Sequence, residues 1–210
     1  LTSVKWVKGE CDTDYTRYPD SGMTMPGGLA NYKLIVTNNG NVPADEFVII
    51  DILPFEGDMG VIDLSARSTA WRPNLVTPIS APAGVTIYYS TAQNPCRTDF
   101  VSSGPAGCTA PNWTTILPTD PTTIQSVKYD FGDLVLNPGD QLELTWDMRV
   151  PVDAPANGEI AWNSFGYKAT RVDNNDPFLP AEPFKVGIAT KPNQPGNYGN
   201  FVWCDTDNDG

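Results

Sequence analysis

The sequence contains no histidine, few basic residues and no long apolar run. Without histidine, a Ser-His-Asp triad, a Cys-His pair and a His-ligated zinc site are all impossible. Only 13 lysines and arginines oppose 25 aspartates and glutamates, and the resulting net charge of −12 repels nucleic-acid phosphates and anionic lipids. No apolar segment approaches the roughly 20 residues of a membrane-spanning helix. We therefore expect no nucleic-acid partner, no membrane insertion and no enzyme.

The N-terminus also lacks the usual signals of a complete exported protein. Leu1 is not an initiator methionine, and no signal-peptide pattern follows it. We expect an excised piece of a longer chain whose export signal lies elsewhere.

The four cysteines contain no C-x-x-C pair, which argues against a zinc ribbon and a thioredoxin-like redox site. Cys96 and Cys108 bracket a short loop of small and turn-forming residues, so closing that loop is easy. A disulfide between them would stabilise the fold by about 3 kcal/mol in the chain-entropy estimate. Two free buried thiols are the alternative. Cys11 and Cys204 are left as a second pair by elimination only.

Period-two patterns of apolar residues predict β-strands along most of the chain. The clearest alternation is in residues 141–150, and further strands are expected at 3–8, 29–37, 46–54, 85–90, 127–136, 159–170 and 184–190. Proline and glycine are abundant, with 20 and 18 residues, and turn-forming clusters separate the strands. No helical period is convincing. The prediction is an all-β fold, a two-sheet antiparallel sandwich of the immunoglobulin-like kind.

Residues 55–126, called here the 55–126 segment, differ from the rest of the chain. They are rich in proline, hold the Cys96–Cys108 pair and show little strand patterning. We expect a long insertion within one β-sandwich covering residues 1–191. Residues 192–200 have the composition of a linker, and residues 201–210 begin another strand and stop.

Several motifs resemble known bacterial surface proteins. VKWVKG, NYKLIVTNNGN, VIIDILP, FGDLVLNPGDQLELTWDMRV and WNSFGYKAT follow one another as in the conserved-repeat domain of such proteins. The tail, GNFVWCDTDNDG, is similar to the opening of the B-type repeats of staphylococcal serine-aspartate adhesins, although Cys204 departs from that pattern. Both resemblances imply a stalk or array of β modules at the cell surface or cell wall, with neighbouring modules of the same chain as partners.

The resemblance extends to collagen-adhesin-type sandwiches, in which a lysine on the first strand bonds covalently to an asparagine near the last strand. The matching positions here are Lys5, Asn163 and a helper, Asp51. Burial disfavours charge, so a neutral Lys5 amine could attack the Asn163 carboxamide while Asp51 polarises the carbonyl and shuttles a proton. In the alternative the side chains are unlinked: Lys5 is a solvated strand residue, and Asp51 caps a turn before Leu53 and Pro54. Lys8 is a second candidate for the donor of the bond.

The acidic tail predicts a calcium site. Asp205, Asp207 and Asp209 place oxygen ligands at alternate positions before a glycine, as in the first half of a calcium loop. Calcium takes about six to eight oxygens, so these three residues alone would bind weakly. A solvated acidic tail is the alternative.

Aromatic residues in or near the 55–126 segment suggest a second possible function. Their rings could stack on sugars, which would make the chain a carbohydrate-binding module for an environmental or host glycan; a host protein is another possible partner. Closing a small secondary core under a long loop is the simpler explanation. The residues are Trp71, Tyr88, Tyr89 and Trp113.

Overall fold

A computed structural model describes residues 1–102 and 104–191, whose regular structure is almost entirely β. The one helical element among them is a 3-10 turn, η1 (Pro121–Thr123). The strands are β1 (Thr2–Gly9), β2 (Ser21–Thr24), β3 (Leu29–Thr37), β4 (Ala44–Ile52), β5 (Asn74–Ser80), β6 (Thr86–Ser90), β7 (Ser126–Asp130), β8 (Gln141–Arg149), β9 (Ile160–Arg171) and β10 (Val186–Thr190).

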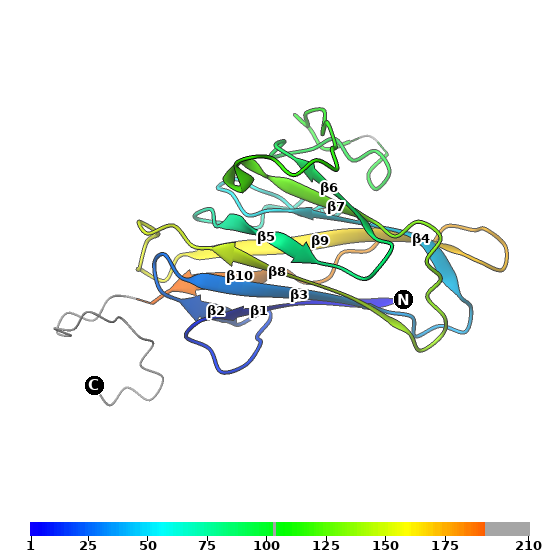
Figure 1. The fold of residues 1–210 in the computed structure, drawn as a ribbon, viewed down its shortest axis with the longest axis horizontal. Coiled ribbons are helices and arrows are strands. Elements are labelled where there is room, and N and C mark those ends of the chain that lie inside the picture. The colour runs from blue at the N-terminus through cyan, green and yellow to red at the C-terminus, as the bar shows by residue number, and fades with distance from the viewer. Residues whose placement is uncertain (103, 192–210) are drawn as a thin grey trace.

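The strands form two sheets that pack face to face, which confirms the predicted sandwich (Figure 1). One sheet has four strands in the order β1-β3-β8-β5, and the other has six in the order β2-β10-β9-β4-β7-β6. Neighbouring strands are antiparallel except β10 and β2, which run parallel. β1 therefore lies at the edge of one sheet, while β4 and β9 are adjacent in the interior of the other.

The core between the sheets follows from the alternation of side chains along each strand. In β3, Tyr32, Leu34 and Val36 are fully buried on one face. β4 is apolar on both faces because both are covered. Phe47 and Ile49 join the main core, whereas Ile50 and Ile52 join a second, smaller cluster with Val61 and Phe100 of the 55–126 segment.

The 55–126 segment is more closely integrated than an insertion with sparse strand patterning would suggest. β5 pairs with β8 at the edge of the four-stranded sheet, and β6 pairs with β7 at the edge of the six-stranded sheet. The segment also packs directly on β9, because Gly166 has no side chain. A Cβ atom there would lie 2.8 Å from Val61 Cγ1.

Among the described residues, no helix is long and apolar enough to cross a membrane.

Candidate cross-linking site

The fold brings Lys5, Asp51 and Asn163 together between the two sheets. Lys5 lies on β1 of the four-stranded sheet, and Asp51 and Asn163 lie on β4 and β9 of the six-stranded sheet. Each takes an inward position of its strand, beside buried apolar neighbours. Their exposed fractions are 1%, 0% and 0%, respectively. The structure thus brings the three predicted residues together in one buried site, and their covalent linkage stays a prediction.

The three side chains contact one another through all their polar atoms. Lys5 Nζ contacts Asp51 Oδ2 and Asn163 Oδ1. Asn163 Nδ2 donates to Asp51 Oδ1 at 2.8 Å and to the backbone oxygen of Ile52 at 2.9 Å. The amine therefore lies against the carboxamide, and the carboxylate bridges the amine nitrogen and the carboxamide nitrogen.

Aromatic rings enclose the amine on the remaining sides. Lys5 Nζ lies 4.7 Å from the ring centroid of Trp146, 5.6 Å from that of Tyr32 and 5.8 Å from that of Phe165. Tyr32 and Trp146 face each other across β3 and β8 and stack with their rings 10° from parallel. The alternation along these strands placed both rings in the core, but it gave no sign that they adjoin Lys5.

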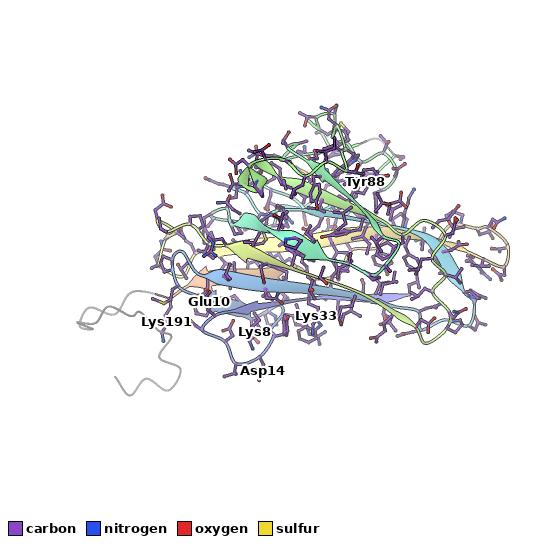
Figure 2. The ribbon with its side chains drawn as sticks, viewed as in Figure 1. Lys8, Glu10, Asp14, Lys33, Tyr88 and Lys191 are labelled. Carbon is purple, nitrogen blue, oxygen red and sulfur yellow. A yellow bond between two sulfur atoms is a disulfide. The ribbon has the colours of Figure 1, made fainter. Side chains whose placement is uncertain are left out.

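Lys8, the alternative donor, lies outside the site. It follows Lys5 by three residues and therefore takes the outward face of β1, and its Nζ donates to the backbone oxygen of Thr13 at 2.6 Å. Figure 2 shows Lys8 near Asp14 at the surface of the molecule. Lys8 as the amine donor is therefore wrong, because its side chain points away from Asn163.

Burial lowers the pKa of Lys5 from 10.5 to about 8. Removal from water is the largest cause, and the nearby Arg67 charge acts in the same direction, whereas the Asp51 carboxylate opposes the shift. Burial also raises the pKa of Tyr32, and the Asp51 carboxylate adds to that shift, so the phenol stays protonated. The amine can thus lose its proton far more readily than an exposed lysine.

This arrangement suits transfer of an acyl group from nitrogen to nitrogen. Lys5 passes a proton to Asp51, and the neutral amine adds to the Asn163 side-chain carbon. Asp51 then delivers this proton to Nδ2 and takes up the second proton of the attacking Nζ. The carbon–nitrogen bond to Nδ2 breaks, one ammonia leaves, and the amide forms with one hydrogen on Nζ. One expectation changes: Asp51 contacts the nitrogen of the carboxamide, and Lys5 contacts the oxygen. Asp51 is therefore placed to carry the proton rather than to polarise the carbonyl.

The Cys96–Cys108 disulfide is present, as predicted. The two Cα atoms are 4.9 Å apart across a sequence separation of 12. Cys204 lies outside the described residues, so its pairing with Cys11 stays a prediction.

Asp205, Asp207 and Asp209 also lie outside the described residues, so the structure gives no view of the predicted calcium site. Among the described residues, no cluster of three or more potential metal ligands occurs.

Two of the four aromatic residues proposed for sugar contact are part of the core. Trp71 and Tyr89 are each 8% exposed, and Trp71 Nε1 donates to the backbone oxygen of Glu159 at 3.0 Å. Their proposed role is therefore wrong, because a sugar cannot reach their faces. Tyr88 and Trp113 are half-buried, and Lys128 Nζ lies over both rings. Trp113 also packs on the second apolar cluster, as the simpler explanation required.

No family model and no curated protein matches the sequence. Among solved structures, the chain is similar to domains D2 and D3 of the major pilin SpaD from Corynebacterium diphtheriae, with 11% identity, a TM-score of 0.40 and coverage of 89% of this chain and 51% of that one. It is similar to the seventh ScaB type I cohesin from Pseudobacteroides cellulosolvens, with 6% identity and a TM-score of 0.42. The match covers 93% of this chain and 99% of the cohesin. It is also similar to ACE19, the collagen-binding subdomain of the Enterococcus faecalis surface protein ACE, with 9% identity and a TM-score of 0.36. The match covers 88% of this chain and 95% of ACE19.

The chain thus spans about half the length of the SpaD structure. Similarity at these identities and TM-scores carries no argument about function.

Proposed function

We propose that this chain is a structural or adhesive module of a bacterial cell-surface protein, stiffened by a covalent amide bond between Lys5 and Asn163. The single observation that supports this proposal is the buried contact of Lys5 with both Asp51 and Asn163. The bond would form once, during maturation of the folded chain, and would involve no turnover.

A buried amine and carboxylate are costly to keep without a reason. Removing each ion from water costs several kcal/mol, and an ion pair in a core often contributes less than apolar side chains of the same volume would. Lys5 and Asp51 nevertheless occupy the centre of the sandwich, beside a carboxamide whose oxygen contacts the amine. A cross-link that ties β1 to β9 gives this cluster a function.

A salt bridge between Lys5 and Asp51, with Asn163 hydrogen-bonded beside it, is the competing arrangement. It uses the same contacts but leaves the carboxamide intact, so the two arrangements differ in mass by one ammonia. Intact mass of the denatured, reduced protein therefore separates them. We expect the wild-type chain to be lighter than its sequence mass by one ammonia.

Asp51→Asn should restore the full sequence mass, because an amide cannot carry the proton from Lys5 to the leaving nitrogen. Asp14→Asn is the matched control, since it makes the same chemical change at an exposed position and should leave the lighter mass unchanged. Full sequence mass in the wild-type protein would refute the cross-link. A lighter mass retained in Asp51→Asn would instead refute the role of Asp51.

The surface location and the partners belong to the same proposal. A self-linked sandwich suits a module that must persist outside the cell, and neighbouring modules of the same chain are its proposed partners. Asp205, Asp207 and Asp209 are proposed to hold calcium together with ligands from the next module, because three aspartates supply too few oxygens. Calorimetric titration should show weak calcium binding by this chain and tighter binding by a chain extended through the next module. Equal affinities would contradict the shared site.

A further inference from the structure

We infer that Arg67, a residue of the 55–126 segment, is a positioning residue for the Lys5–Asn163 cross-link. It donates to the Ile52 carbonyl, which accepts from the leaving nitrogen of the Asn163 carboxamide. It also places a positive charge near the Lys5 amine. This inference rests on the proposed function. It assigns to the 55–126 segment a part in the chemistry of the sandwich core.

The contact between Arg67 and the site passes through a single backbone oxygen. The Ile52 oxygen accepts a hydrogen bond from Asn163 Nδ2 and another from Arg67 Nη1, each at 2.9 Å. Ile52 is the last residue of β4, and its register partner on β9 is Ser164, which follows Asn163. Arg67 Nη1 also lies 3.5 Å from Ser164 Oγ. The guanidinium thus occupies the point where β4 ends beside the reacting residue.

Arg67 is itself buried and ion-paired. Its side chain is 3% exposed, and its Nη2 forms an ion pair with Asp58 Oδ2 at 2.5 Å. The backbone nitrogen of Arg67 donates to the backbone oxygen of Asp58 at 3.1 Å. Lys185 Nζ donates to the backbone oxygen of Arg67 at 2.5 Å. A planar guanidinium fixed in this way can hold a carbonyl in one orientation.

The same part of the 55–126 segment is fastened to β9 on the other side of Asn163. Thr69 Oγ1 donates to Asp58 Oδ2 at 2.9 Å and accepts from the backbone nitrogen of Trp162 at 3.3 Å. Arg67 and Thr69 therefore contact β9 at Ser164 and Trp162, the two residues that flank Asn163. The segment holds this stretch of β9 as well as the carbonyl that receives the carboxamide nitrogen.

The positive charge of Arg67 has a second effect. It lies close enough to Lys5 to lower the pKa of the amine, in the same direction as burial. The groups that act on Lys5 from the packed elements are Asp51 on β4, Arg67 in the 55–126 segment and Glu182 before β10, and the two acids oppose Arg67. Removing the Arg67 charge should therefore make Lys5 harder to deprotonate.

The test is the rate of ammonia loss in Arg67→Met, followed by intact mass from pH 6 to pH 10 after the denatured, unlinked protein is allowed to fold. We expect a rate about tenfold or more below the wild-type rate near neutral pH, because the carbonyl that receives the leaving nitrogen loses its buried donor. We also expect the pH above which the rate falls to move upward. In Arg67→Lys, the pH above which the rate falls should stay near its wild-type value, because the ammonium keeps the charge. Only part of the rate should be recovered, because an ammonium lacks the planar set of donors of a guanidinium.

Arg97→Met is the matched control. Arg97 is 2% exposed, lies in the same segment and donates to the backbone oxygens of Gly60 and Val61 rather than to Ile52 or Ser164. Arg97→Met should perturb the 55–126 segment as much as Arg67→Met does. It should nevertheless leave the rate of ammonia loss and its pH profile near those of the wild type. Equal slowing by Arg67→Met and Arg97→Met would overturn the inference. If Arg67→Met fails to fold, the double variant Asp58→Asn/Arg67→Met removes both charges of the ion pair together with the donor to the Ile52 oxygen, and the same slowing is expected.

The inference and the proposed function can fail separately. If the wild-type protein keeps its full mass, the cross-link is refuted, and Arg67 is then tested by NMR titration of Lys5 in Asn163→Ala, which cannot link. There, adding Arg67→Met should raise the Lys5 pKa, and adding Arg97→Met should not. An unchanged Lys5 pKa would overturn the electrostatic part of the inference, and a normal rate of linking in Arg67→Met would overturn the positioning part.

Discussion

At the scale of single residues, Lys5 Nζ contacts Asp51 Oδ2, and the position of the proton between these two atoms governs the proposed reaction. An amine that keeps its proton cannot attack a carboxamide, and a carboxylate that never receives one cannot deliver it to the leaving nitrogen. Burial acts against the charge on Lys5 and lowers its pKa, because a low-dielectric surrounding disfavours an ammonium. The contacts of Asp51 with Lys5 and with Asn163 Nδ2 give the proton a path between the two nitrogens.

The position of this proton leads to a prediction about pH. Below a pH of about 8 the pair keeps its proton, because the pKa of Lys5 is lowered only that far, and transfer to Asp51 is then internal. The rate of ammonia loss should therefore be flat from pH 6 to about pH 8 and fall by about tenfold per pH unit above it. Intact mass during folding at each pH measures the rate. A rate that rises to a plateau above pH 8 would show that the free amine reacts without this proton.

At the scale of elements, most strands are visible in the sequence because one face is buried and the other is not. β3 and β8 match their predicted ranges to within a residue, since each alternates cleanly. β5 was missed for two reasons. It contains Pro78, which is tolerated because β5 pairs only with β8 at the edge of its sheet, and its register shifts between Val76 and Ser80. The four residues of β2 are too few to show a period.

The difference between regular strands and the segments between them also explains which site residues could be predicted from the sequence. Lys5, Asp51 and Asn163 occupy regular strands, so the alternation assigns each of them to the inward face. Arg67 lies between strands, where no period relates a residue to its surroundings. Its role depends on where the backbone of β4 ends, and that is set by the packing of the 55–126 segment on β9. A pattern along the sequence carries no information of this kind.

The disulfide belongs to this scale, because it closes a loop of the 55–126 segment whose Phe100 packs in the second apolar cluster rather than in the main core. Replacing both cysteines, Cys96→Ala with Cys108→Ala, should lower the stability of that loop by about 3 kcal/mol, the chain-entropy value for so short a closure. Limited proteolysis should then cut between residues 96 and 108 while the rest of the chain resists. The mass loss of one ammonia should persist, since the loop packs in the second apolar cluster, whereas Lys5, Asp51 and Asn163 lie between the two sheets. Loss of the cross-link in the double variant would show that the loop supports the core.

At the scale of the whole molecule, the cross-link would join residues 158 positions apart. Closing a loop of that length lowers the entropy of the unfolded chain and should stabilise the fold by about 5 kcal/mol. Lys5→Met/Asp51→Leu removes the bond and the buried charges together, so its free energy of unfolding in denaturant should fall by about that amount. Lys8→Met, at the surface of the same strand, is the control. Equal stability of the double variant and the wild type would contradict a closed loop.

The placement of Leu1 and Lys191 relative to this bond has a mechanical consequence. Leu1 lies on one side of the centre along the long axis, and Lys191 lies at the far end on the other side (Figures 1 and 2). Tension applied at these two points would enter through β1 and pass from Lys5 to Asn163, bypassing everything between them. About 550 Å of extended chain would then be withheld from a pulling force. Single-molecule stretching should show only the short extensions from residues 1–4 and 164–191, and the full extension should reappear in Asp51→Asn.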